Sequence, residues 1–202
     1  MLNRESALTF TGIDQVILAT STEPQDAILK DYTLNQKVSY FEGDPEDVMQ
    51  RYIDVCDDNG LDVVVRVTAD MPYIDDDICS LLLQAHFQSG ADYTVGREAA
   101  IGVNLEIFNT ACLKRIKSYF PSADLSEYMT WYFQNNPEYV RINVVDLPEI
   151  YKRPYRLTLD YEEDLALFNA IHEALGPNDY SLKAVISYLD EHPEIAKMNS
   201  HL

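Results

Sequence analysis

Basic residues are scarce in this 202-residue sequence, in which 15 lysines and arginines stand against 34 aspartates and glutamates, for a formal net charge of −19. Nucleic acids and anionic membranes are bound through basic surfaces, so we expect neither as a partner. A polyphosphate ligand would also be repelled by this charge, unless a divalent cation and a few arginine or lysine side chains offset it.

Cysteines and long apolar runs are also sparse. Cys56, Cys79 and Cys112 lie far apart without CxxC spacing, which gives no disulfide framework and no zinc motif and fits a reducing compartment. No apolar run reaches the roughly 20 residues that cross a bilayer. Residues 1–6 lack the apolar core of a signal peptide. We therefore expect a cytoplasmic protein.

Glycine is limited to seven scattered residues, and neither GxGxxG nor GxxxxGK[ST] occurs. These two motifs bend the backbone around a phosphate group at the start of a helix. The sequence therefore offers no glycine-rich phosphate cradle of either kind.

What is present is an alternation of strand and helix patterns, with 47% hydrophobic and 24% charged residues. Such alternation predicts βαβ units, and hence an α/β fold with a mostly parallel (mixed) sheet flanked by helices, in a single domain over 1–202. Expected strands cover 15–19, 38–41, 62–67, 92–95, 103–107, 140–145 and 155–159. Expected helices cover 2–10, 24–32, 44–59, 75–87, 111–119, 126–133, 162–175 and 182–189.

A carboxylate follows the most apolar of these strands. Residues 62–67 are apolar on both faces, as in a central parallel strand, and Asp70 comes just after them, with Pro72 two residues further on. Carboxylates at this place suit Mg²⁺, which takes one or two of them together with substrate phosphates. The alternative is that Asp70 only orders the turn before the next helix.

Asp160 repeats this arrangement at the end of the expected strand 155–159. The acids after it, Glu162, Glu163 and Asp164, are favourable at a helix N-terminus for macrodipole reasons alone. Two such carboxylates in one sheet could share a Mg²⁺ on a triphosphate, as metal-assisted nucleotidyl transfer requires. Their spacing in the sequence does not by itself bring them together.

Three ordered blocks resemble one known family, the acylneuraminate and spore-coat polysaccharide cytidylyltransferases. They read FEGDPEDVMQRY over 41–52, DVVVRVTADMP over 62–72 and RLTLDYEEDL over 156–165. Residues 13–21 fit as well, so that matching elements run in the same order from about 13 to 175. Each block is modest alone, and the ordered set is specific.

The resemblance implies a nucleotide-diphospho-sugar transferase (Rossmann-like) fold and a reaction that joins CTP to a sugar acid, giving a CMP-sugar and pyrophosphate with Mg²⁺. It implies Asp70 and Asp160 as catalytic metal carboxylates. Arg66 would be catalytic and bind the nucleotide, together with Arg51 and Ser21. A homodimer is the oligomer that the family favours.

Two further segments bear on the sugar. IGVNLE over 101–106 resembles the family's GLDVEV strand, with Asn104 in place of aspartate, so Asn104 and Glu106 become candidate substrate contacts or else a structural polar pair. SEYMT over 126–130 resembles SEHVT, with Tyr128 in place of histidine, and adds Glu127 as a candidate contact. Neither segment identifies the sugar.

The main departure lies at the front, where the family's first strand and its phosphate-binding QARxxSxRLPGK loop have no counterpart. Three readings stay open: the natural chain starts earlier, the chain is a degenerate paralogue, or another subunit completes it. The function hypotheses are thus a sugar-activating cytidylyltransferase and a non-catalytic sugar- or partner-binding paralogue. A guanylyltransferase relative is a further alternative.

Overall fold

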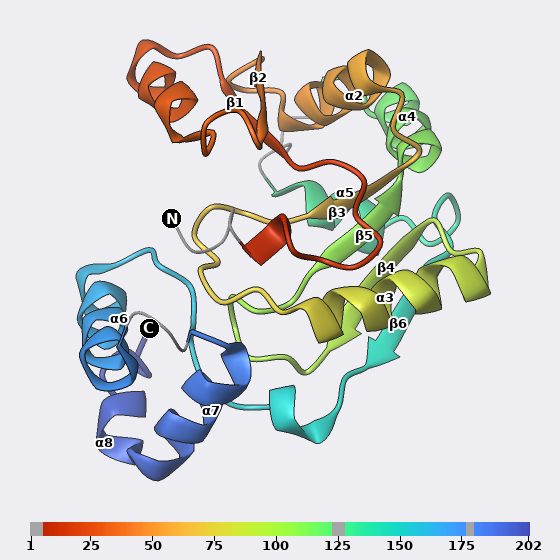
Figure 1. The fold of residues 1–202 in the computed structure, drawn as a ribbon. Coiled ribbons are helices and arrows are strands. Elements are labelled where there is room, and N and C mark those ends of the chain that lie inside the picture. Colours follow the sequence, from red (N-terminus) through yellow and green to blue (C-terminus); the bar gives the residue numbers. More distant parts are fainter. Residues whose placement is uncertain (1–5, 123–127, 177–179) are drawn as a thin grey trace.

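The structure, a computed structural model, describes residues 6–122, 128–176 and 180–202 (Figure 1). Its strands are β1 (Ile17–Ser21), β2 (Ser39–Gly43), β3 (Val63–Arg66), β4 (Tyr93–Arg97), β5 (Glu106–Asn109) and β6 (Ile142–Asp146). Its helices are α2 (Val48–Asn59), α3 (Asp76–Ser89), α4 (Thr110–Tyr119), α5 (Met129–Gln134), α6 (Glu162–Leu175), α7 (Leu182–Glu191) and α8 (Pro193–Ala196), with the 3₁₀ helices η1 (Pro24–Tyr32) and η3 (Glu149–Tyr151).

The strands form two sheets. The larger has the order β3-β5-β4-β6, in which β5 runs antiparallel to both of its neighbours and β4 runs parallel to β6. β1 and β2 form a separate parallel pair. An α/β fold with mixed sheets flanked by helices is therefore confirmed. In the described residues, β1 pairs only with β2 and β3 only with β5, so each has one edge without a partner strand.

The larger sheet is buried on both faces. Successive residues of a strand point to opposite sides of the sheet, so two buried neighbours show that both faces are covered. Ile107 and Phe108 are neighbours on β5 and both are fully buried. Ile107 belongs to a cluster that includes Leu82 of α3, whereas Phe108 belongs to a second cluster that includes Leu113 of α4. The sheet therefore lies between α3 on one face and α2, α4 and α5 on the other (Figure 1).

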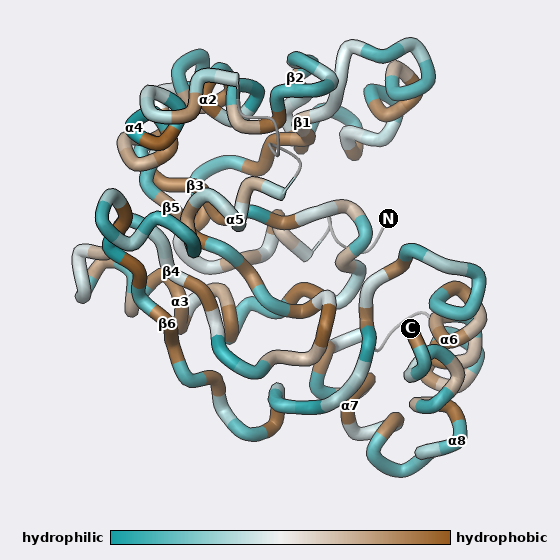
Figure 2. The backbone as a smooth tube through the Cα atoms, turned by 180° about the vertical axis from the view of Figure 1, so that it is seen from behind, coloured by the Kyte–Doolittle hydropathy of each residue, from teal (hydrophilic) through white to brown (hydrophobic). Residues whose placement is uncertain are grey.

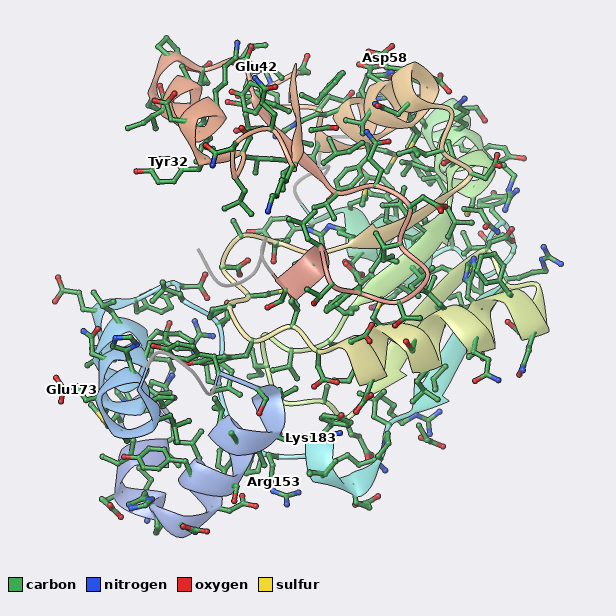
Figure 3. All side chains as sticks on the ribbon, in the orientation of Figure 1. Tyr32, Glu42, Asp58, Arg153, Glu173 and Lys183 are labelled. Carbon is green, nitrogen blue, oxygen red and sulfur yellow. The ribbon has the colours of Figure 1, made fainter. Side chains whose placement is uncertain are left out.

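Polar and apolar residues are segregated as this layering requires. Figure 2 shows hydrophobic stretches along the strands of the larger sheet and largely hydrophilic loops at the outside. The excess acid lies on the surface: Glu42, Asp58 and Glu173 are exposed and point away from the core (Figure 3). None of the helices in the described ranges combines the length and the apolar character that crossing a membrane requires.

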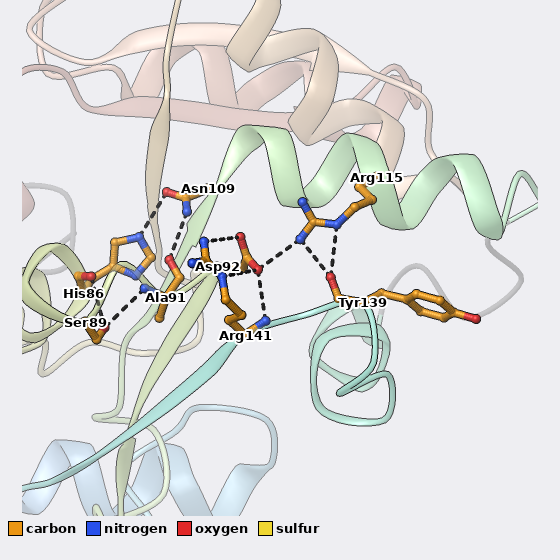
Figure 4. A network of polar contacts seen from close by, with 8 residues as sticks. All are labelled: His86, Ser89, Ala91, Asp92, Asn109, Arg115, Tyr139 and Arg141. Carbon is orange, nitrogen blue, oxygen red and sulfur yellow. Dashed lines mark hydrogen bonds and ion pairs between the residues drawn. The ribbon is translucent and has the colours of Figure 1, made fainter.

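A polar network ties the starts of β4 and β6 to α4 (Figure 4). Asp92 accepts hydrogen bonds from the backbone N (3.0 Å) and Nε (3.3 Å) of Arg141 and lies 3.0 Å from Nη2 of Arg115. Buried His86 lies on the opposite side of the network, with its ring nitrogens 2.9 Å from Oγ1 of Thr94 and 3.1 Å from Oδ1 of Asn109. Both of its nitrogens therefore have structural partners.

Most expected elements occur, with four corrections. Residues 155–159 form no strand, because the amide of Leu157 bonds Ile101 O (2.7 Å) while that of Leu159 bonds Asp70 O (2.9 Å), so no single neighbour supplies a ladder. The strand expected at 103 begins only at Glu106. The expected helix 2–10 has only one turn within the described residues 6–10, and the segment 24–32 is a 3₁₀ helix.

Candidate functional site

Two carboxylates meet at one hydroxyl. Thr158 Oγ1 lies 2.8 Å from Oδ2 of Asp70 and 3.3 Å from Oδ2 of Asp160. Thr158 is buried, Asp70 is half-buried and Asp160 is exposed. The structure therefore brings together the two residues that the sequence singled out at separate strand ends, 90 positions apart, and neither is fully buried.

The backbone around the pair explains why they meet. Asp70 follows β3 through a short turn, and its carbonyl accepts the amide of Leu159, which fixes the two segments side by side. On the other flank, Gly102 has φ +86°, and a Cβ atom there would lie 2.4 Å from the carbonyl oxygen of Leu157. Only glycine permits this approach, so Gly102 sets how closely the segment carrying Thr158 packs.

A buried ion pair lies directly behind the carboxylates. Arg156 donates from Nε to Oδ1 of Asp164 (3.0 Å) and from Nη2 to Oδ2 (3.1 Å), and its Nη2 also donates to Oδ2 of Asp160 (2.6 Å). The Asp164 side chain is 0% exposed. Burial opposes its ionisation, but Arg156, the amides of Asp160 and Tyr161, and Asn199 outweigh burial and lower the pKa of Asp164 to about 2.

A second ion pair sits at the end of β3. Arg66 and Glu106 are cross-strand partners of β3 and β5, and Nη1 of Arg66 lies 2.5 Å from Oε2 of Glu106. The other oxygen, Oε1, accepts hydrogen bonds from Tyr93 Oη (2.5 Å) and Thr130 Oγ1 (2.6 Å). Burial works against the charged form of Arg66, but Tyr52 and Glu106 outweigh it and raise the pKa of Arg66.

Two arginine side chains near these strands each have a nitrogen that makes no hydrogen bond within the described residues. Nε of Arg66 and Nε of Arg51 are both buried without a hydrogen-bond partner in the part of the chain that the structure describes. Arg51, on α2, packs against Gly43 at the end of β2, where a Cβ atom would lie 2.6 Å from Arg51 Cγ. A buried donor without a partner carries a desolvation cost that an anionic ligand would offset.

The other predicted site residues have local partners. Asn104 makes two hydrogen bonds with the backbone of Gly96, accepting at Oδ1 (3.0 Å) and donating from Nδ2 (2.8 Å). Ser21, at the end of β1, donates to Oδ2 of Asp26 (2.5 Å) and accepts from the amide of Glu23 (3.1 Å). No contact within the described ranges joins Ser21 to the carboxylate pair. Glu127 lies outside the described residues.

The donor set at the pair fits Mg²⁺. Asp70 and Asp160 supply two hard oxygen ligands, and Mg²⁺ commonly takes one or two carboxylates, with waters and substrate phosphates for the rest. Among the described residues there is no group of three or more histidine, cysteine or acidic side chains that could hold a metal. Two carboxylates leave the other coordination positions of Mg²⁺ to waters and phosphate oxygens.

Sequence reasoning missed Thr158, Arg156 and Asn199 at this site. Asn199 donates from Nδ2 to Asp164 Oδ1 (2.7 Å) and to the carbonyl of Arg156 (3.0 Å). The role of Asn199 could not have been predicted from the sequence around Asp164, because the two residues lie 35 positions apart. Thr158 and Arg156 could have been found, since they share a short segment with Asp160.

Residues 4–193 match the family model described as cytidylyltransferase. The chain belongs to the cytidylyltransferase family. It is therefore a member of a transferase family, and the resemblance inferred from the three sequence blocks is confirmed.

Two other proteins are similar to this cytidylyltransferase-family chain over most of its length. It is 32% identical over 196 residues to the spore coat polysaccharide biosynthesis protein SpsF of Bacillus subtilis, covering 96% of this chain and 82% of SpsF. It is 24% identical over 191 residues to the uncharacterised protein MJ1063 of Methanocaldococcus jannaschii, covering 94% of this chain and 79% of that protein.

Solved structures agree on the fold of this family member. A cytidylyltransferase from Leptospira borgpetersenii superposes with a TM-score of 0.84 at 26% identity, over 98% of this chain and 84% of the other. A CMP:2-keto-3-deoxy-manno-octonic acid synthetase solved in complex with CTP has a TM-score of 0.60 at 12% identity, over 86% and 85% of the two chains. The second likeness concerns the fold alone.

Proposed function

We propose that this chain is a Mg²⁺-dependent cytidylyltransferase that joins CTP to a sugar acid in the synthesis of a surface polysaccharide or glycan. The observation that carries the proposal is the meeting of Asp70 and Asp160 at the Thr158 hydroxyl, in a chain of this family. The name of SpsF supports a place in polysaccharide synthesis. A homodimer in the cytoplasm is part of the same proposal.

The reaction balances without a further reactant. The sugar hydroxyl oxygen bonds the α-phosphorus of CTP, the bond from that phosphorus to the bridging oxygen of the β-phosphate breaks, and pyrophosphate leaves. The hydroxyl proton passes to solvent. Asp70 and Asp160 would hold the Mg²⁺, which supplies positive charge to the phosphates. Arg66, Arg51 and Ser21 would donate to phosphate or nucleotide oxygens.

The buried arginine nitrogens support the nucleotide part of the proposal. Nε of Arg66 and Nε of Arg51 are donors without partners among the described residues, in a chain whose net charge of −19 otherwise repels phosphate. Asn104, Glu106 and Glu127 are the proposed sugar contacts. For Asn104 and Glu106, contact with the sugar would add to the internal hydrogen bonds they already make.

The test is pyrophosphate release from CTP with Mg²⁺ and a panel of sugar acids. Asp70→Asn and Asp160→Asn keep side-chain shape but remove the charge that holds the cation, so each should lower the rate at least about 100-fold. Asp58→Asn, on the exposed face of α2, is the matched control and should leave the rate unchanged. Full activity in both site variants would show that the metal assignment is wrong.

Nucleotide binding can be measured separately from turnover. Thermal unfolding with CTP, GTP, UTP or ATP, each with Mg²⁺, should show a raised midpoint with CTP. Ligand at about 100 times its dissociation constant adds roughly 2.7 kcal/mol to the free energy of unfolding, which corresponds to roughly 5 to 10 °C for a chain of this size. A shift with GTP instead would favour a guanylyltransferase. No shift with any nucleotide would favour a non-catalytic paralogue.

A further inference from the structure

The Thr158 hydroxyl lies next to both carboxylates of the pair. It is 5% exposed and reaches Oδ2 of both Asp70 and Asp160, yet it carries a single proton. The shorter distance identifies Asp70 as the acceptor of that proton, and Asp160 lies beside the same hydroxyl. Thr158 therefore fixes the Asp70 side chain toward the place where Asp160 lies.

The backbone that presents Thr158 and Asp160 is held from behind. Oδ2 of Asp164 accepts the amides of Asp160 and Tyr161, both at 3.0 Å, and also accepts from Arg156. Arg156 thus closes a ring between the first and last residues of the segment 156–164. The segment has no strand ladder to stiffen it, so this ring takes over that role.

The ring is completed by the C-terminal end of the chain. Asn199 is 1% exposed, and its Nδ2 donates both to Asp164 and to the carbonyl of Arg156. The side-chain oxygen of Asn199 is buried without a partner among the described residues. Burying an amide oxygen without a hydrogen bond costs free energy. The two hydrogen bonds that Asn199 donates are therefore the contacts that hold its side chain in place.

We propose that Thr158 and Asn199 are positioning residues for the Asp70–Asp160 pair, through which the C-terminal segment 193–202 controls how tightly the pair binds a divalent cation. The inference rests on the proposed function, because it takes the pair as the cation site. It adds two residues that touch neither the cation nor the nucleotide. It also predicts that a substitution of Asn199 weakens cation binding at Asp70.

The test measures cation affinity directly. Mn²⁺, used in place of Mg²⁺, is titrated into the full chain with CTP, and free Mn²⁺ is followed by its electron paramagnetic resonance signal. Loss of a residue that orients metal ligands typically weakens metal binding about 10- to 100-fold. We expect about 10-fold weaker binding for Thr158→Val and for Asn199→Ala, and near-normal binding for Thr158→Ser, which keeps the hydroxyl.

Matched controls separate positioning from general destabilisation. Thr110→Val and Asn136→Ala each remove a buried polar group with a hydrogen bond to a backbone carbonyl, but away from the pair. These controls should lower the melting temperature without changing the Mn²⁺ affinity of the folded chain. Because Thr158→Val is close in shape to threonine, it gives an answer even where Asn199→Ala fails to fold.

The outcomes distinguish this inference from the proposed function. Wild-type binding of Mn²⁺ that Asp70→Asn abolishes and Thr158→Val leaves unchanged would overturn the inference alone. No Mn²⁺ binding by the wild type would overturn the proposed function and the inference with it. Weaker binding in Thr158→Val, restored in Thr158→Ser and absent from the controls, would establish the positioning role.

Discussion

Asp164→Asn tests whether the buried ion pair behind the carboxylates stabilises the fold. The substitution keeps side-chain shape and removes the charge that Arg156 pairs with. The pKa of Asp164 falls from 3.8 to about 2 in the folded chain. At about 1.4 kcal/mol per pKa unit, this shift corresponds to roughly 2.5 kcal/mol of folding free energy at neutral pH. For a chain of this length the melting temperature should fall by roughly 5 to 10 °C.

The dependence on pH gives the sharper result. A carboxyl group whose pKa is lowered by folding adds stability above its unfolded pKa and loses it as the pH falls through the folded value. The difference between wild type and Asp164→Asn should therefore be constant above about pH 5 and shrink between about pH 4 and 2. Glu163→Gln, an exposed change in the same helical turn, is the control. Equal melting temperatures for the two variants at pH 7, or a difference independent of pH, would refute the reasoning.

Three further changes test individual contacts of the fold, each measured by urea unfolding. Gly102→Ala should destabilise the fold by at least about 2 kcal/mol because its Cβ would meet the Leu157 carbonyl, whereas Gly60→Ala, with φ +65° and open space, should cost only about 1 kcal/mol; equal costs would contradict the close approach. Glu106→Gln leaves the Arg66 guanidinium without its anion and should cost about 1 to 3 kcal/mol, and no loss would contradict the pairing. Asp92→Asn should remove stability that is present at pH 7, since Arg141 and Arg115 outweigh burial and lower the pKa of Asp92; a loss that does not shrink as the pH falls below the ordinary aspartate range would contradict this.

The sequence predicted the site better where the signal was local. Helix α6 was expected over 162–175 and occurs over Glu162–Leu175, because its acids and its terminal glycine mark both ends. Whether Asp70 and Asp160 meet was left open by their spacing, and only the family resemblance implied that they act together; the structure places both at the Thr158 hydroxyl. The antiparallel direction of β5 was not foreseeable, since an apolar run carries no information on its direction.

Long-range partners account for what sequence reasoning missed. Glu162, Glu163 and Asp164 look alike as acids in the first turn of a helix, yet only Asp164 turns inward and becomes fully buried. The deciding feature is its partner set, Arg156 and Asn199, which the fold supplies. The Arg66–Glu106 pair likewise depends on the register of β3 against β5. Register is fixed by tertiary packing, which single-sequence patterns do not contain.

Asp160 and Asp164, four positions apart, both pair with Arg156. Arg156 holds Asp164 through two nitrogens, Nε and Nη2, and reaches Asp160 only through Nη2. Asp164 is 0% exposed and Asp160 is 43% exposed. A cation that approached Asp160 would compete for the single bond that Arg156 makes there, while the buried pair with Asp164 keeps its Nε contact. Asp164 can therefore hold the segment in place while Asp160 exchanges partners, as the proposed binding and release of a cation with its phosphate ligand requires.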